Sequence, residues 1–274
     1  MKIPLKDDVM LRQALHSGTW YPSDREEIEK YVDQRAKKVR AIAAVCPHAG
    51  WIYSGMTAGK VYSLLKPSKL YVLIGPNHRG AGAPVSVYPD GGWQTPLGAI
   101  EVDGKVAAAI VAGSRSAKAD PSAHANEHSI EVQIPFIKLI SPEAKIVPIS
   151  MYDYRPQVCA DLGLAIANAV KVSYDVSEVM LIASSDMSHY VTSANAKKMD
   201  ALAIEKILAL DPDGLLSVVS SLDISMCGSG PVAAVIRAAK ELGATNARLI
   251  DYSTSGDVTG DNSEVVGYAG VVIS

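Results

Sequence analysis

Residues 39–55 read VRAIAAVCPHAGWIYSG, and this stretch decides the fold. Its first half, Val39–Cys46, is a short run of Ala, Val and Ile, which is typical of a strand buried on both faces in a parallel sheet. Pro47 ends the strand because it has no N–H to donate, and His48 follows at once. A new helical pattern begins at Ser54. Because open α/β sheets bind ligands beyond the carboxyl ends of their strands, the sequence predicts that His48 belongs to a binding site.

Two later stretches repeat this arrangement of a buried strand followed by a histidine. Leu70–Ile74 is a second apolar run, and a Gly-Pro-Asn turn leads from it to His78. Val179–Ala183 is a third run, and the polar turn after it carries His189. If neighbouring strands carry them, the imidazoles of His48, His78 and His189 converge on one crevice, and we predict such a shared site. The alternative is that each histidine only satisfies hydrogen bonds in its own loop.

Two more residues are candidates for chemistry at this site. Asp186 lies in the same turn as His189 and either orients a neighbouring imidazole or caps the next segment. Cys227 precedes a glycine-rich turn and a helix N-terminus, where the helix dipole favours the thiolate that binds metals or attacks electrophiles. The alternative for Cys227 is a buried, inert thiol, which we expect for Cys46 and Cys159.

A second polar cluster lies farther along the chain, where we expect a helix from Glu127 to about Ile140. On that helix Glu127 and Glu131 would share one face, and Glu131 could equally be a solvated charge. We place His128 near the pocket and His124 on the loop surface. Three aromatic residues could line the pocket, although single aromatic residues more often only pack in the core: Trp20, Tyr53 and Trp93.

The fold predicted for residues 1–274 is one α/β domain with a mostly parallel central sheet flanked by helices. Apolar residues make up 48% of the chain, which is enough for a large core, and there is no internal repeat or linker. Further strands are expected at 85–88, 146–151, 248–252 and 265–273, and helices at 103–112, 158–172, 194–208, 212–220 and from Pro231 to about 242. A capping box at Ser23 starts a helix after an irregular opening arm.

Composition excludes several classes of function. The net charge of −3 without a long basic run argues against a nucleic-acid or anionic-membrane partner. The longest apolar run, Val106–Ala112, is far too short to span a membrane, and the N-terminus lacks the apolar core of a signal peptide. Three widely spaced cysteines suit reduced thiols, so we expect a soluble, cytoplasmic protein. Neither a dinucleotide fingerprint nor a phosphate loop nor a Gly-x-Ser-x-Gly elbow occurs, and no nucleotide cofactor is expected.

A combination of short motifs, spread in order over almost the whole chain, resembles the Memo family, which is named after a mediator of receptor-tyrosine-kinase-driven cell motility. The motifs are Gly18-Thr19-Trp20-Tyr21-Pro22, Pro47-His48-Ala49-Gly50, Tyr53-Ser54-Gly55, Gly75-Pro76-Asn77-His78, Thr95-Pro96-Leu97-Gly98, Glu127-His128-Ser129-Ile130-Glu131, Ser185-Asp186-Met187-Ser188-His189, Cys227-Gly228 and Tyr252-Ser253-Thr254-Ser255-Gly256-Asp257. The resemblance implies a domain similar to the class III extradiol dioxygenases (LigB-like), which use non-haem iron. It also implies a radical-SAM protein as a pathway partner, because prokaryotic relatives are often grouped with one.

The resemblance further implies which residues form the site. The pocket histidines and cysteine of Memo proteins fall on His48, His78 and Cys227, with Asp186 and His189 beside them. Trp20 and Tyr53 match aromatic positions of the same vestibule. In the dioxygenases two histidines and a carboxylate bind the iron, whereas here a thiolate stands where that carboxylate belongs.

From these residues we expect a metal-dependent redox or oxygenase-like enzyme. His48, His78 and Cys227 would bind Fe(II) or copper, His189 would act as acid and base, and Asp186 would orient it. The substrate, a small molecule, would contact three further side chains: Trp20, Tyr53 and His128.

Two other functions stay open at this point. The first is a non-catalytic module that binds phosphotyrosine-like peptides or small anions in the same pocket, since histidines near a helix N-terminus suit an anion. The second is a hydrolase in which Cys227 or Ser188 works with His189.

Overall fold

Five parallel strands form the centre of the sheet in the computed structural model, which describes residues 10–274. In spatial order they are β6 (Ile100–Val102), β8 (Lys145–Met151), β3 (Leu70–Pro76), β9 (Val179–Ser184) and β2 (Ala43–Cys46). The strands β3, β9 and β2 are direct neighbours, so their carboxyl ends meet at one place along the same edge of the sheet.

Antiparallel strands extend this parallel centre on both sides, so that the sheet is mixed. Next to β2 lies β12 (Val265–Ile273), which also pairs with β10 (His189–Val191) and β11 (Ala247–Thr254). Beyond β6 lie β5 (Gly92–Trp93) and β1 (Leu11–Arg12), and β4 (Val85–Val87) joins β8 to β7 (Lys118–Ala119). The predicted strands are confirmed to within a few residues. The exception is β2, which begins at Ala43 because Val39 forms only an isolated bridge to Leu65.

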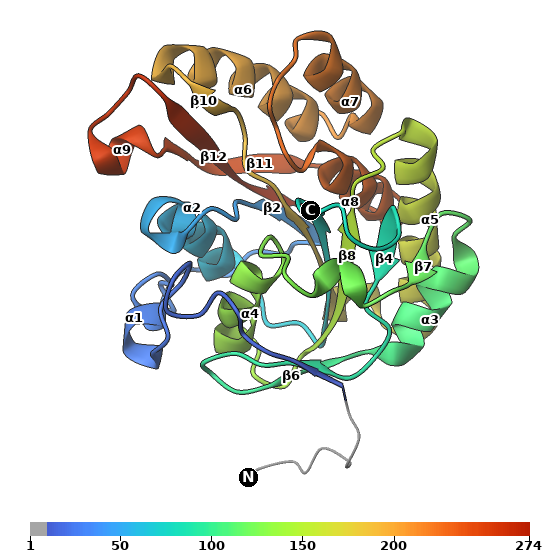
Figure 1. Ribbon diagram of the computed structural model, residues 1–274. Coiled ribbons are helices and arrows are strands. Elements are labelled where there is room, and N and C mark those ends of the chain that lie inside the picture. The colour runs from blue at the N-terminus through green and yellow to red at the C-terminus, as the bar shows by residue number, and fades with distance from the viewer. Residues whose placement is uncertain (1–9) are drawn as a thin grey trace.

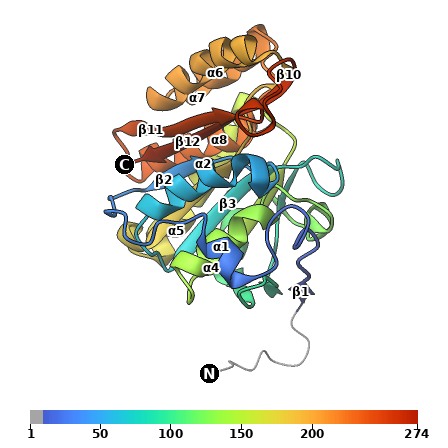
Figure 2. The same ribbon diagram turned by 90° about the vertical axis from the view of Figure 1, so that its left-hand side faces the viewer.

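Helices cover both faces of the sheet, as Figures 1 and 2 show. One face carries α1 (Arg25–Glu29), α2 (Trp51–Leu64) and α4 (Ile134–Ile140); the other carries α3 (Gly104–Gly113), α5 (Pro156–Ser173) and α8 (Ser229–Glu241). Along β3, Leu70, Val72 and Ile74 pack into one apolar core, whereas Tyr71 and Leu73 pack into the core on the opposite face. This alternation on a strand buried on both sides produces one α/β domain with two core layers.

The remaining helices lie near the C-terminal strands. α6 (Ser193–Leu208) packs against β11 and β12, and α7 (Pro212–Ser221) packs between α6 and α8. The short helix α9 (Gly256–Thr259) lies in the connection from β11 to β12. Within residues 10–274, no helix combines the length and the apolar character needed to cross a membrane.

Three predicted helix starts differ from the structure. The helix expected from Glu127 begins only at Ile134, after a 3-10 turn, because the Glu127 carboxylate accepts hydrogen bonds from nearby backbone N–H groups instead. α2 begins at Trp51 rather than Ser54, and the Trp51 ring stacks on Phe136 at 3.8 Å. α1 is capped by Asp24, not Ser23, and ends after five residues.

The start of α8 lies against the end of β9 so closely that only glycine fits at its N-cap, Gly228. A Cβ there would lie 2.5 Å from the Ser184 carbonyl oxygen and 2.5 Å from the Ser185 Cβ. We therefore expect Gly228→Ala to lower the free energy of unfolding by about 1–3 kcal/mol, measured by urea denaturation.

Gly113→Ala in α3 is the matched control, because its Cβ would meet Ala165 at an ordinary 3.6 Å. That variant should keep or slightly raise stability, since alanine favours helix over glycine. Equal losses in the two variants would show that the contact at Gly228 does not limit packing.

Candidate metal centre and its pocket

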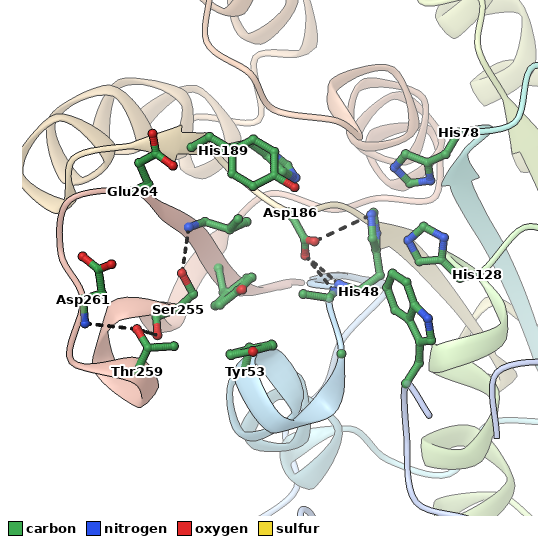
Figure 3. A pocket seen from close by; sticks show the side chains of 16 residues that line it. His48, Tyr53, His78, His128, Asp186, His189, Ser255, Thr259, Asp261 and Glu264 are labelled. Carbon is green, nitrogen blue, oxygen red and sulfur yellow. Dashed lines mark hydrogen bonds and ion pairs between the residues drawn. The ribbon is translucent and has the colours of Figure 1, made fainter. Parts of the chain in front are cut away.

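His48, His78 and Cys227 converge beyond the carboxyl ends of β2 and β3 (Figure 3 shows the two histidines). The ring centroids of His48 and His78 lie 5.3 Å apart. Cys227 comes from the turn before α8, and its Sγ lies 3.3 Å from His48 Nε2. One ligand atom from each residue lies within 4.8 Å of the other two. The predicted convergence of these three side chains is therefore a feature of the structure.

A buried hydroxyl determines which nitrogen of His48 carries the proton. Ser184 Oγ lies 2.6 Å from the Ser129 carbonyl oxygen, to which it donates its only proton. His48 Nδ1, 3.0 Å from the same Oγ, must then be the donor. Since Nδ1 holds the proton, the lone pair of Nε2 is free and lies beside Cys227.

A buried carboxylate determines that Nδ1 of His78 is a hydrogen-bond donor. Its Nδ1 lies 2.9 Å from Glu127 Oε1, and its backbone N–H donates to Glu127 Oε2 at 2.6 Å. Burial, the largest single influence, disfavours the charged form of Glu127, but the hydrogen bond and charge of His78, the Ser129 backbone N–H and His128 together outweigh it and hold the pKa of the carboxyl well below its usual range. An ionised carboxylate only accepts, so Nδ1 of His78 donates, and in the neutral imidazole the lone pair is then on Nε2. Such carboxylate–histidine pairs are typical of metal sites.

His189 lies in the same pocket but outside the group of three. Its Nδ1 donates to the Ser225 carbonyl oxygen at 2.8 Å, and its backbone N–H donates to Ser225 Oγ at 2.7 Å. The residue expected to orient it, Asp186, instead accepts from the backbone N–H groups of His48 and Ala49 at 2.7 and 3.3 Å. Ser225 therefore orients His189, and Asp186 fixes the turn that carries His48.

The environment of the Cys227 thiol differs from the one we expected. Burial and the nearby Asp186 carboxylate raise the pKa of this thiol well above its usual value, despite the helix N-terminus that follows. The loss of hydration and the negative neighbour outweigh the partial positive charge of the helix end. A cation beside the sulfur is thus needed to keep it as a thiolate. The other two thiols, Cys46 and Cys159, are buried, and burial raises the pKa of each.

The pocket above the three residues has a volume of about 580 Å³, a size that suits a small molecule. Trp20, Tyr53 and His128 line it, together with Asp186 and His189. The ring of His128 stacks on that of His78 at 4.6 Å, and Trp20 covers His128 at 4.1 Å. All three predicted substrate contacts thus face the cavity, whereas Trp93 does not line it.

The opening arm reaches the pocket because a buried ion pair holds it. Arg12 Nη1 lies 2.6 Å from Glu131 Oε2, and the Arg12 guanidinium lies 4.2 Å above the Trp93 ring. Glu131 Oε1 also accepts from the backbone N–H of His16 at 2.7 Å and from Tyr21 Oη at 2.9 Å. The interpretation of Glu131 as a solvated charge is therefore wrong.

His124 is a second correction, because it is fully buried rather than on the loop surface. Its Nε2 lies 3.1 Å from the Ser86 carbonyl oxygen, and its backbone carbonyl accepts from Arg12 Nε at 2.7 Å. The local sequence is polar, but the long-range contact with Arg12 pulls the segment into the interior.

Sequence reasoning missed three residues that hold the site, Gln133, Ser184 and Ser225, and it named Glu127 without placing it behind His78. Gln133 Nε2 donates to Ser184 Oγ at 3.0 Å and to the Pro47 carbonyl oxygen at 2.8 Å. A serine at the end of an otherwise apolar strand was the available signal for Ser184, since a buried hydroxyl needs partners. Ser225 binds the His189 ring through its backbone carbonyl, for which the sequence has no signal.

Buried histidines predict how stability depends on pH. Burial lowers the pKa of His124 to about 4 and that of His128 to about 3, from an ordinary value of 6.5. As the pH falls below about 6.5, the unfolded chain binds protons that the folded chain does not. We expect the metal-free protein to lose up to about 1.4 kcal/mol per histidine and pH unit down to about pH 4, measured by urea denaturation.

His124→Gln is the informative variant, because the amide can donate to the Ser86 carbonyl oxygen without titrating. Its stability should fall less steeply with pH than that of the unchanged chain. An unchanged slope would contradict the assignment of a buried, neutral imidazole at His124.

The hydrogen bonds also predict the tautomers of three histidines. In metal-free protein at mildly alkaline pH, His48, His78 and His189 should each carry the proton on Nδ1, because each Nδ1 faces an acceptor. Nitrogen chemical shifts from long-range NMR correlations report the tautomer directly. A proton on Nε2 of His48 or His78 would contradict the donor arrangement described above.

Comparison with known proteins shows the family of this chain. A family model described as Memo-like protein matches residues 12–272. A MEMO1 family protein of Methanothermobacter thermautotrophicus is 43% identical over 276 residues, which cover 95% of this chain and 99% of the relative. MEMO1 family proteins of Pyrobaculum aerophilum and Aquifex aeolicus are 40% and 39% identical over 278 and 268 residues, each covering 96% of this chain and 98% of the relative. The chain therefore belongs to the family of Memo-like proteins.

Proposed function

We propose that the protein is a metal-dependent redox or oxygenase-like enzyme that binds Fe(II) or copper through His48, His78 and Cys227. The observation that carries this proposal is the mutual approach of these three donors, which come from two strand ends and a helix start. Both imidazoles donate through Nδ1, so the neutral form of each has its lone pair on Nε2. This arrangement of ligands held by outer hydrogen bonds is the usual one at metal sites.

The spacing of the donors fits one ion. A nitrogen about 2.0 Å and a sulfur about 2.3 Å from a shared metal, at angles of about 90–110°, are about 3.0–3.5 Å apart. His48 Nε2 and Cys227 Sγ lie 3.3 Å apart. Two imidazoles and one sulfur suit iron, copper or zinc, and of these iron and copper change oxidation state. A bound ion of this kind would supply electron transfer to or from a ligand.

The other pocket residues have roles that the same geometry supports. His189 would accept or donate a proton at Nε2, since its Nδ1 is held by Ser225. Trp20, Tyr53 and His128 would bind a small-molecule substrate against the cavity wall. We retain the similarity to the class III extradiol dioxygenases and the radical-SAM pathway partner as parts of this proposal.

The composition of the pocket favours this function over a module for phosphotyrosine-like peptides or small anions. Among the described residues that line the pocket, none is Lys or Arg, the residues that recognise phosphate. Burial lowers the pKa of His48 and of His128, so these two imidazoles are uncharged near neutral pH.

The contacts also argue against the hydrolase. Ser188 donates to the buried Asp200 at 2.5 Å rather than facing His189, and the partner of Cys227 is His48. Neither proposed nucleophile therefore lies in hydrogen-bond contact with His189, the base that the hydrolase would use.

Metal loading tests the proposal. Protein purified and reconstituted anaerobically with Fe(II), Cu(I) or Co(II) should bind about one equivalent, and His48→Ala and Cys227→Ser should each lower the affinity at least about tenfold. The Co(II) protein should show a sulfur-to-metal charge-transfer band in the near ultraviolet that Cys227→Ser lacks.

His189→Asn and His124→Gln are the matched controls, because each changes a histidine outside the three-residue group. Both should keep the metal content and the Co(II) spectrum. Unchanged metal stoichiometry and affinity in His48→Ala and Cys227→Ser would rule out this metal centre.

A further inference from the structure

The end of the pocket away from the metal ligands has a different character. It is formed by the connection between β11 and β12, which carries Asp261 and Glu264. In Figure 3 these two carboxylates lie opposite His48 and His78, with Tyr53 between the two ends. A ligand that contacts the metal centre would therefore extend toward an acidic wall.

No Lys or Arg among the described lining residues opposes this wall. Within residues 10–274, Glu264 makes no hydrogen bond or ion pair, and Asp261 accepts hydrogen bonds only from Ser263. A third lining carboxylate, Asp186, lies at the inner end, where it accepts from the backbone N–H groups of His48 and Ala49. An anionic group placed here would meet like charges, whereas a cation would supply the missing partner.

Aromatic side chains also line the pocket. Trp20, Tyr53, Tyr190 and Tyr268 all line it, and aromatic faces attract cations. Tyr190 has a left-handed backbone with φ of 56° while its side chain is 75% exposed. This conformation falls at an irregularity in the pairing of β10 with β12 between His189 and Val191, which leaves the Tyr190 side chain at the pocket.

We propose that the pocket selects a small organic ammonium ion, whose charged group lies among the aromatic side chains and the carboxylates of Asp261 and Glu264. The other end of the ligand points toward His48 and His78. This inference deepens the proposed function by naming the charge class of its substrate. The preference for a cation, however, comes from the outer wall and does not require a bound metal.

Three probes that differ only in their terminal group test the charge preference on the full-length, metal-free chain. They are tyramine, the neutral 4-propylphenol and the anionic 3-(4-hydroxyphenyl)propionate, each titrated by calorimetry. We expect tyramine to bind at least about fivefold more tightly than either of the other two. Equal affinities, or no detectable binding of tyramine, would overturn the proposal.

Variants then locate the preference on the wall. The double variant Asp261→Asn, Glu264→Gln should weaken tyramine binding to within about twofold of 4-propylphenol, and Glu264→Lys should make the propionate the better ligand. Glu143→Gln is the matched control, because this exposed carboxylate lies before β8 at the opposite end of the sheet and should change nothing. A tyramine preference that survives both wall variants would overturn the assignment.

The outcomes separate this inference from the metal centre. A cation preference in a chain that fails to load metal would support the acidic wall and contradict the proposed redox function. Metal loading without any preference for tyramine would support the metal centre and contradict the acidic wall as a cation site.

Discussion

The hydroxyl group of Ser184 is the contact on which the site depends. It is the last residue of β9, and its oxygen contacts His48 Nδ1, Gln133 Nε2 and the Ser129 carbonyl oxygen. These three partners come from the turn after β2 and from the segment before α4, so one buried group joins three parts of the chain. Loss of the hydroxyl would leave several buried polar groups unpaired, each at a cost of about 1–3 kcal/mol. The same contact fixes the tautomer of His48, which links the stability of the fold to its chemistry.

Burial gives the site its electrostatic character. His48 and His128 are kept neutral, whereas the pKa of Glu127 is held low, despite burial, by His78, the Ser129 backbone N–H and His128 acting together. The inner end of the pocket thus presents neutral nitrogen donors backed by a carboxylate, a combination that suits a metal cation. The pKa of the Cys227 thiol is raised by its surroundings, so a bound cation would be required for the sulfur to act as a ligand.

Two segments that are far apart in the sequence complete the pocket. The opening arm is anchored by Arg12 and Glu131 and brings Trp20 over His128. The connection between β11 and β12 brings Asp261 and Glu264 to the outer wall. The strand ends provide the candidate metal-binding atoms, and these two segments provide the walls. The walls can therefore change to suit another small molecule while the metal-binding atoms stay in place.

The sequence by itself determined the family, the buried strands and the identity of the main donors. Short apolar runs that end in proline or glycine are local signals, and the order of β3, β9 and β2 as neighbours made His48 and His78 meet as predicted. Only the tertiary structure decided which groups surround them: Glu127 behind His78, Ser225 behind His189, and His124 in the interior. These contacts join residues 36 to 49 positions apart or use backbone carbonyls. No local pattern of residues encodes them, because burial and pairing are set by the packing of the whole chain.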